Sequence, residues 1–283
     1  MRLGFHISIA GGFKNVVERA KARGCETVQL FSRNPRGWKY QPLDEKDIDL
    51  FQRDLKKESI TPVFVHMPYL PNLASSKSDL FKLSVDSLIE DLKRSEKVGA
   101  QFLIMHIGSA ENEEKGLKLM VNGINKAFSE VENKIVLLLE NTSGGGNELG
   151  HRFEQIGEIM DGIDQKQRIG VTFDTAHAFG AGYDLRTQQD INQTLQEFDK
   201  KIGLEKLYLI HLNDSKAKLG SRNDRHWHIG QGEIGKGMGF ILNHPLLRDK
   251  PFIMETPRAN LKEDLMNMKT VRRLLQQKVK RGS

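Results

Sequence analysis

Eight short apolar runs recur along the chain at roughly the spacing of one strand plus one helix. Polar or turn-forming residues bound each run, which is the pattern of a buried strand. Because the runs are apolar almost without interruption, they predict a parallel sheet that is covered on both faces. The expected strands span residues 3–7, 27–31, 62–66, 102–106, 135–140, 170–174, 207–211 and 252–255.

Segments with helical spacing of apolar residues follow most of these runs, and Gly24 and Gly99 stand where two of them end. Strands that alternate with helices in this way close into an α/β fold, the (β/α)8 or TIM barrel. An open doubly wound sheet is the alternative, but no Gly-x-Gly-x-x-Gly turn follows the first run. The expected helices span residues 15–23, 80–97, 114–128, 153–160, 190–202 and 261–277.

The organisation of the chain fits one barrel domain over residues 1–283, since no linker or low-complexity stretch divides it. We expect residues 278–283 to form a flexible tail. The single cysteine, Cys25, allows no disulfide framework, which fits a reducing compartment. No apolar run approaches the ~20 residues that span a bilayer, and the first strand leaves no room for a signal peptide. We therefore expect a cytoplasmic protein without a membrane partner, and a monomer because no long apolar segment suggests an obligate interface.

The charge balance is basic, with a formal net charge of +6 and a pI near 9.2. Clustered Lys and Arg side chains release counterions when they bind nucleic acid, so this balance favours a polyanionic partner. A solvated surface with an excess of lysine explains the same number equally well. Charge alone does not separate the two interpretations.

Residues of metal-binding type end six of the expected strands. The carboxyl ends of barrel strands all open onto one face, where the βα loops build the active site. One such residue is more often structural, but six converging carboxylates and imidazoles without a cation repel one another and lose solvation. The six are His66, His106, Glu140, Asp174, His211 and Glu255.

Two loops add further candidates. His177 follows the sixth strand, and the loop after the seventh strand offers Asp214, Asp224 and His226. With His177, Asp224 and His226 the strand-end residues make nine candidate ligands, five of them histidines. Because a catalytic zinc takes about three protein ligands, nine indicate about three metals with some bridging. His6, at the end of the first strand, faces the same mouth, either to hydrogen-bond a ligand or simply to pack.

Four motifs resemble those of the endonuclease IV family, the type 2 apurinic/apyrimidinic (AP) endonucleases. They are HMPYLPNLA at 66–74, ENTSG at 140–144, GVTFDTAHAFGAG at 170–182, and HLNDSK followed by GSRNDRH within 211–226. They occur in the family's order, and the resemblance covers essentially the whole chain. It implies a xylose isomerase-like TIM barrel whose three zinc ions, with Mn²⁺ possible in one or more sites, cleave DNA on the 5′ side of abasic sites. It also implies action on blocked 3′ ends in double-stranded DNA.

The resemblance further implies roles for individual residues. Glu140 bridges the first zinc to the second, and Glu255 both binds metal and orients the attacking hydroxide, so these two are the expected catalytic residues. The expected sets are His66, His106 and Glu140 for the first zinc, Glu140, Asp174, His211 and Glu255 for the second, and His177, Asp224 and His226 for the third.

The residues expected to contact DNA lie in two loops. In the loop at 32–38 Arg33 and Arg36 flank a proline and precede Trp38, which without the resemblance reads equally well as a surface loop. The family uses this loop in the minor groove, which points to Arg36. Tyr69 and Leu70 match the family's wedge, which fills the gap left by an extruded nucleotide. Gly37 and Pro71 depart from the family pattern, and neither is an expected metal ligand, so these departures concern lesion recognition and not catalysis.

Two other functions compete with the nuclease interpretation. Sugar isomerases and epimerases of the xylose isomerase-like group also gather Glu, Asp and His at strand ends, but they need only one or two metals. A nucleic-acid-binding protein with structural zinc is the other alternative, although such sites are usually rich in cysteine. About three zinc ions per chain favour the nuclease over both.

Overall fold

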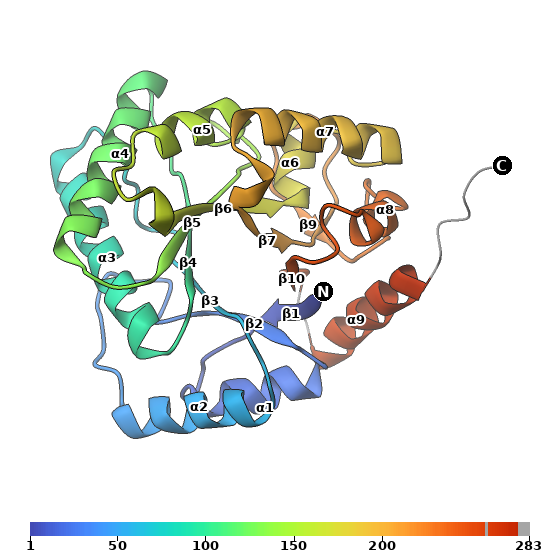
Figure 1. Ribbon diagram of the computed structural model, residues 1–283, viewed down its shortest axis with the longest axis horizontal. Helices are drawn as coiled ribbons and strands as arrows, with labels where there is room; N and C mark the ends of the chain where they lie inside the picture. Colours follow the sequence, from blue (N-terminus) through green and yellow to red (C-terminus); the bar gives the residue numbers. More distant parts are fainter. Residues whose placement is uncertain (258–259, 277–283) are drawn as a thin grey trace.

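The eight expected strands are present and close into a barrel. The computed structural model describes residues 1–257 and 260–276, and Figure 1 shows its helices arranged around the central strands. All neighbouring barrel strands are parallel, and the order closes with β1 beside β10. The bounds are β1 (Arg2–His6), β2 (Thr27–Phe31), β3 (Val63–His66), β4 (Phe102–His106), β5 (Val136–Glu140), β6 (Ile169–Asp174), β7 (Leu207–His211) and β10 (Pro251–Met254).

The expected helices are also present, shifted by at most two residues within the described part of the chain. Gly24 and Gly99 adopt positive φ angles of 69° and 77° just after α1 and α3, as expected for residues that end helices. Residue 277 and the expected tail at 278–283 lie outside the described residues. The six helices are α1 (Lys14–Ala22), α3 (Ser78–Lys97), α4 (Glu113–Glu130), α5 (Phe153–Asp161), α7 (Gln188–Lys201) and α9 (Leu261–Gln276).

Three helices and a small hairpin were not expected from the sequence. The helix α2 (Glu45–Lys57) is mostly charged, yet Ile48, Phe51 and Leu55 bury one face. The short helices α6 (Thr175–Ala181) and α8 (Gly237–Asn243) are too brief to show a clear period. The loop that contains Asp224 leads into β9 (His226–Trp227), which pairs antiparallel with β8 (Asp214–Ser215).

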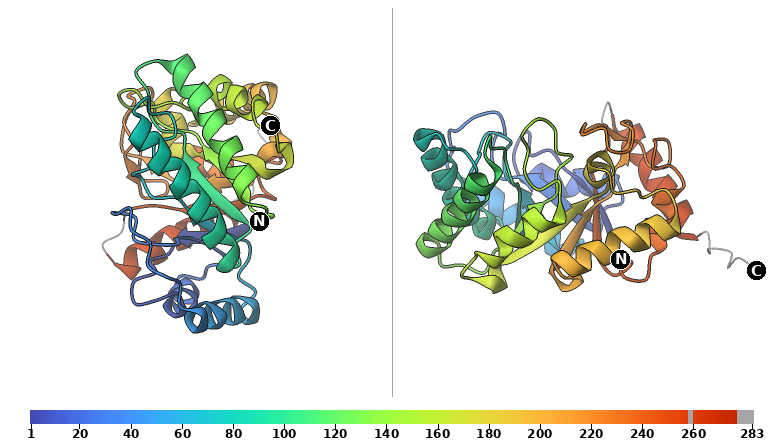
Figure 2. Two further views of the ribbon diagram at one scale, coloured as in Figure 1. Left: turned by 90° about the vertical axis from the view of Figure 1, so that its left-hand side faces the viewer. Right: turned by 90° about the horizontal axis from the view of Figure 1, so that it is seen from above.

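The hydrophobic core has two parts, one outside the barrel wall and one inside it. A polar layer lies above the inner part, at the mouth of the barrel. Apolar side chains of strands and helices pack between the barrel wall and the outer ring, and in Figure 2 the long helices α3 and α4 lie side by side over the strands. Inside the barrel, Phe64, Ile104, Leu138, Leu209 and Ile253 fill the interior. Above this plug, four strands end in buried polar residues, namely His66, Glu140, Asp174 and His211. None of the described helices is both long and apolar enough to cross a membrane.

Candidate metal centre

Glu140, the last residue of β5, is the point on which the strand-end histidines converge. Its side chain is fully buried. One oxygen, Oε2, lies 3.0 Å from His66 Nε2 and 3.3 Å from His106 Nε2. The other, Oε1, lies 2.8 Å from His211 Nδ1 and 3.4 Å from His177 Nδ1. A carboxylate whose two oxygens face opposite sets of imidazoles has the geometry of a bridging metal ligand.

A second group forms around His211 on the Oε1 side of Glu140. Glu255 Oε2 lies 3.3 Å and Asp174 Oδ2 3.8 Å from His211 Nδ1. Glu255 was expected to end the last strand, but β10 stops at Met254 and Glu255 is the next residue. This shift of one residue leaves its carboxylate inside the ring of ligands.

A third group joins the two loops that follow β6 and β7. The Nε2 atoms of His177 and His226 lie 3.3 Å apart, and the oxygens of Asp224 lie 3.4 and 3.3 Å from them. Asp174 Oδ2 also comes within 3.6 Å of His226 Nε2, which the sequence did not predict. The potential ligand atoms lie within 4.8 Å of one another in each of three groups: His66, His106 and Glu140; Glu140, Asp174, His211 and Glu255; and Asp174, His177 and His226.

The histidines are oriented as metal ligands require. In four of them one ring nitrogen contacts a carbonyl oxygen, which can only accept a hydrogen bond, so that nitrogen carries the proton and the opposite nitrogen faces the carboxylates. In the neutral ring, the facing nitrogen offers its lone pair to a cation. The contacts are His66 Nδ1 to the Met67 carbonyl (2.6 Å), His177 Nδ1 to the Asn141 carbonyl (2.9 Å), His226 Nδ1 to the Glu255 carbonyl (3.1 Å) and His211 Nε2 to Gln29 Oε1 (2.7 Å).

The electrostatics also fit a cation. Burial disfavours the charged form of His211, yet the carboxylates of Glu140 and Glu255 raise its pKa to about 9. Burial opposes ionisation of Asp224, yet its contact with His177 lowers its pKa to about 2. The site thus favours positive charge so strongly that the His211 imidazole tends to hold a second proton, in keeping with its raised pKa. Nitrogen and carboxylate oxygen donors without thiolates suit zinc, manganese and similar divalent ions.

Three amide side chains that the sequence analysis did not single out hold the ligands in place. Gln29 donates from Nε2 to Glu255 Oε1 (2.6 Å), and Asn213 donates from Nδ2 to Asp174 Oδ2 (2.7 Å). Asn141 Oδ1 accepts from the Asp174 backbone N–H at 2.7 Å. The signal for Gln29 was available, because it is an amide side chain in the middle of the run at 27–31, which apart from Thr27 is otherwise apolar.

Two other polar residues named in the sequence analysis lie outside these three groups. Asp214 was offered by the same loop as Asp224, but its carboxylate accepts backbone N–H groups of Ser215, Gly232 and Ile234 at 2.8, 3.0 and 3.0 Å. It therefore anchors a loop. His6 hydrogen-bonds the ligand layer, since its Nδ1 lies 2.9 Å from Gln29 Nε2 and 3.3 Å from Glu255 Oε1.

The two arginines of the loop at 32–38 have different surroundings. Arg33 is 4% exposed, contacts Asp91 Oδ2 at 3.3 Å and stacks over the Tyr40 ring at 4.5 Å. It fixes the loop to α3 and is not available to a ligand. Arg36 is exposed.

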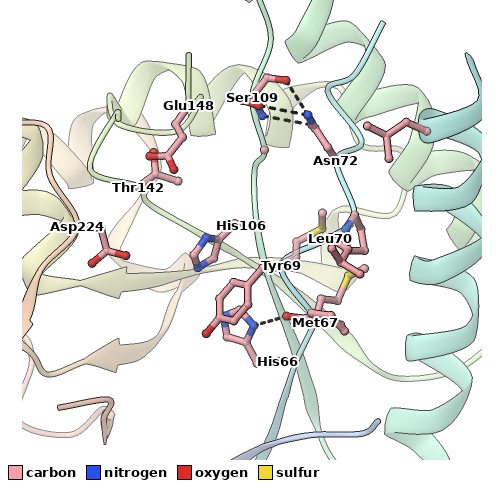
Figure 3. Close-up of a pocket in the computed structure, with 15 residues that line it drawn as sticks. His66, Met67, Tyr69, Leu70, Asn72, His106, Ser109, Thr142, Glu148 and Asp224 are labelled. Atoms are coloured by element: carbon pink, nitrogen blue, oxygen red, sulfur yellow. Dashed lines mark hydrogen bonds between the residues drawn. The ribbon is translucent and has the colours of Figure 1, made fainter. Parts of the chain in front are cut away.

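A cavity of about 440 Å³ opens beside the metal-ligand groups. Figure 3 shows the rings of Tyr69, His66 and His106 close together in it, with Asp224 also at its wall. Tyr69 is 68% and Leu70 40% exposed, and both line this cavity. The expected wedge residues therefore border the same cavity as the metal ligands.

The fold and the site define a class of protein. A family model described as "Xylose isomerase-like TIM barrel" matches residues 17–277. Together with the three groups of ligand residues, this match identifies a metal-dependent TIM-barrel enzyme.

Individual relatives define the family within that class. The probable endonuclease 4 of Methanosphaerula palustris is 47% identical over 280 residues, which are 97% of this chain and 98% of that protein. The probable endonuclease 4 of Halothermothrix orenii is 46% identical, covering 91% and 94%. The crystal structure of endonuclease IV from Thermus thermophilus superposes with a TM-score of 0.87 at 36% identity, covering 97% and 99%. The chain belongs to the endonuclease IV family and is a DNA-repair endonuclease.

Proposed function

We propose that this chain hydrolyses the phosphodiester bond on the 5′ side of abasic sites in double-stranded DNA. The products are a 3′-hydroxyl and a 5′-deoxyribose phosphate, and the same centre removes blocking groups from 3′ ends. The observation that carries the proposal is the joining of three ligand groups through two shared carboxylates, Glu140 and Asp174. Such a cluster suits a phosphate diester, because its charge must be neutralised at several oxygens at once.

The proposed cofactors are three zinc ions, with manganese able to replace zinc in one or more positions. Glu140 and Asp174, which each belong to two ligand groups, would be shared between neighbouring ions. At the third metal position, Asp224 contacts His226 Nε2. Asp174, which belongs to the second group, also approaches His226 Nε2. The proposed ligands are His66, His106 and Glu140; Glu140, Asp174, His211 and Glu255; and His177, Asp224 and His226.

Within this centre, the two glutamates have distinct tasks. When bound, the cations supply a water of lowered pKa as nucleophile and positive charge against the phosphate. Glu140 keeps its two oxygens on opposite sides and so fixes the spacing of the positions. Glu255 Oε1 accepts a hydrogen bond from Gln29. The other oxygen, Oε2, faces His211 and the metal-ligand groups, where it orients the attacking water.

The substrate contacts that we propose lie on the rim. Tyr69 and Leu70 enter the duplex and occupy the gap left when the abasic nucleotide turns out of the helix. An abasic nucleotide has no base to unpair, so extruding it costs less than extruding a normal one, and this difference selects the lesion. Arg36 contacts the minor groove and phosphates beside the gap, in keeping with the net charge of +6.

The remaining proposals concern the whole chain. We infer one functional domain over residues 1–283, acting as a monomer in the cytoplasm. The single closed barrel, with the strand-end ligands beside one cavity, supports the one domain.

A labelled duplex with one tetrahydrofuran abasic analogue tests the activity, beside an intact control duplex and without added magnesium. The analogue cannot undergo β-elimination, so a single cut 5′ to it that leaves a 3′-hydroxyl demonstrates hydrolysis. We expect that cut in the first duplex and none in the control. Absence of cutting after zinc and manganese have been restored would contradict the proposal.

A further inference from the structure

We propose that Gln29 is a positioning residue of the metal centre, which fixes both the ring nitrogen that His211 presents and the oxygen that Glu255 presents. Its side chain points from β2 into the polar layer and is fully buried. Every polar contact of its amide goes to the ligand layer. The inference extends the proposed function, because it names the residue that aligns two of the proposed ligands.

The hydrogen bonds of Gln29 have only one consistent direction. The Glu255 carboxylate can only accept, so the amide nitrogen of Gln29 faces it, at 2.6 Å from Oε1. The amide oxygen then faces His211 Nε2 at 2.7 Å and must accept from it. His211 Nε2 therefore carries a proton. Its other nitrogen, Nδ1, faces Glu140, Asp174 and Glu255 at 2.8, 3.8 and 3.3 Å.

The amide nitrogen of Gln29 also contacts His6. Gln29 Nε2 lies 2.9 Å from His6 Nδ1, and His6 packs its ring against Phe31 with centroids 4.3 Å apart. The amide is thus held on three sides and cannot turn over without placing its oxygen against the Glu255 carboxylate. Because the Gln29 amide has one fixed orientation, it holds the side chains of His211 and Glu255 in one orientation each.

A purely structural role does not explain this arrangement. The rest of β2 is apolar apart from Thr27, and an apolar residue at position 29 avoids the cost of burying an amide. A buried polar side chain that only satisfies local structure bonds to backbone groups, as the Thr27 hydroxyl does by donating to the Pro62 carbonyl at 2.5 Å. Gln29 instead binds three side chains of the centre.

The test compares Gln29→Met and Gln29→Glu with Thr27→Val as the matched control. Thr27 is buried in the same strand, and its substitution removes a hydrogen bond without touching any proposed ligand. Zinc affinity is measured by competition with a chelator. We expect Gln29→Met to bind one zinc about 10–100-fold more weakly than the unmodified chain, and Thr27→Val to bind as the unmodified chain does.

The second readout is the ring N–H of His211 in the ¹⁵N-labelled, zinc-loaded protein. Gln29→Met is expected to lose the slowly exchanging Nε2–H signal, whereas Gln29→Glu keeps it because its carboxylate still accepts from His211. Wild-type zinc affinity together with a retained Nε2–H signal in Gln29→Met would overturn the proposal. If Gln29→Met does not fold, loss of the signal in the isosteric Gln29→Glu variant overturns it instead. Neither measurement uses DNA, so failure here is distinct from failure of the proposed nuclease activity.

Discussion

Glu140 and Tyr69 lie on the same face of the barrel but in opposite environments. Glu140 is fully buried, and both of its oxygens contact histidines, whereas Tyr69 leaves 68% of its surface exposed although its ring centre is 5.9 Å from that of His106. Buried charges must be paired within the fold, so the centre is assembled before any substrate arrives. The exposed ring of Tyr69 buries apolar surface only when a ligand covers it, so Tyr69 contributes when the substrate binds.

The same contrast separates the two arginines of the loop at 32–38. Arg33 is paired with Asp91 and serves the fold, while Arg36, three residues on, is exposed. Substitutions in the centre should therefore change metal content and turnover, and substitutions on the rim should change DNA affinity alone.

The largest effect is expected from Glu140→Ala. This change removes the carboxylate on which four histidines converge, so zinc is lost from at least one position. Turnover should fall by more than the ~10²–10⁴-fold that one positioned acid or base contributes. Elemental analysis and incision of the abasic duplex check both effects. Full zinc content in this variant would show that Glu140 is not a shared ligand.

Glu255→Gln should have the next largest effect. Glutamine keeps the shape of the side chain and removes its negative charge, so the fold and DNA affinity persist while the orientation of the attacking water is lost. We expect single-turnover incision to slow by about 10²–10⁴-fold. Near-normal incision would remove Glu255 from the mechanism.

Tyr69→Ala tests the rim. Stacking of an aromatic side chain on a base is worth ~1–3 kcal/mol, so affinity for the abasic duplex should fall by about 5–150-fold. Fluorescence anisotropy at fixed salt measures this. Leu83→Ala, an exposed leucine on α3, is the control and should bind normally. Loss of zinc from Tyr69→Ala would mean that this residue supports the centre instead of contacting DNA.

The centre should also respond to pH, because protons compete with cations for its imidazoles. The metal-free protein holds a proton on His211 up to a pKa of about 9, where burial is outweighed by Glu140 and Glu255. Zinc affinity should therefore rise between pH 6 and 9, by about tenfold per pH unit for each proton displaced. Chelator competition across that range measures the slope. A zinc affinity that does not change with pH would contradict protonation of His211 in the metal-free centre.

Arg36→Ala is expected to have the smallest effect. Loss of one phosphate contact should weaken binding to all duplexes by about tenfold or less, and lower the slope of log affinity against log salt by about 1. Arg33→Ala should differ in kind, because the Asp91 charge stays buried without its partner and the fold loses ~3–5 kcal/mol. An unchanged salt slope in Arg36→Ala would place the DNA contacts elsewhere on the rim.

The barrel and the candidate ligands could be predicted from the sequence alone. Uninterrupted apolar runs and short polar loops constrain strands locally, and the C-terminal end of a strand is visible in the chain. That is why the strand ends at His66, His106, Glu140, Asp174 and His211 were predicted to the residue. The short helices and the β8–β9 hairpin were not, since tertiary packing stabilises them more than their own periodicity does.

The separate roles of residues that look alike in the sequence depend on contacts that form only in the folded barrel. Arg33 and Arg36 look alike in the sequence, and Asp91, which separates their roles, is 58 residues away from Arg33. Gln29 gains its position only because barrel closure brings β2 near Glu255, 226 residues later. Hydrogen bonds and ion pairs depend on distances of a few ångströms, and closure of the barrel sets those distances between segments that the chain keeps far apart.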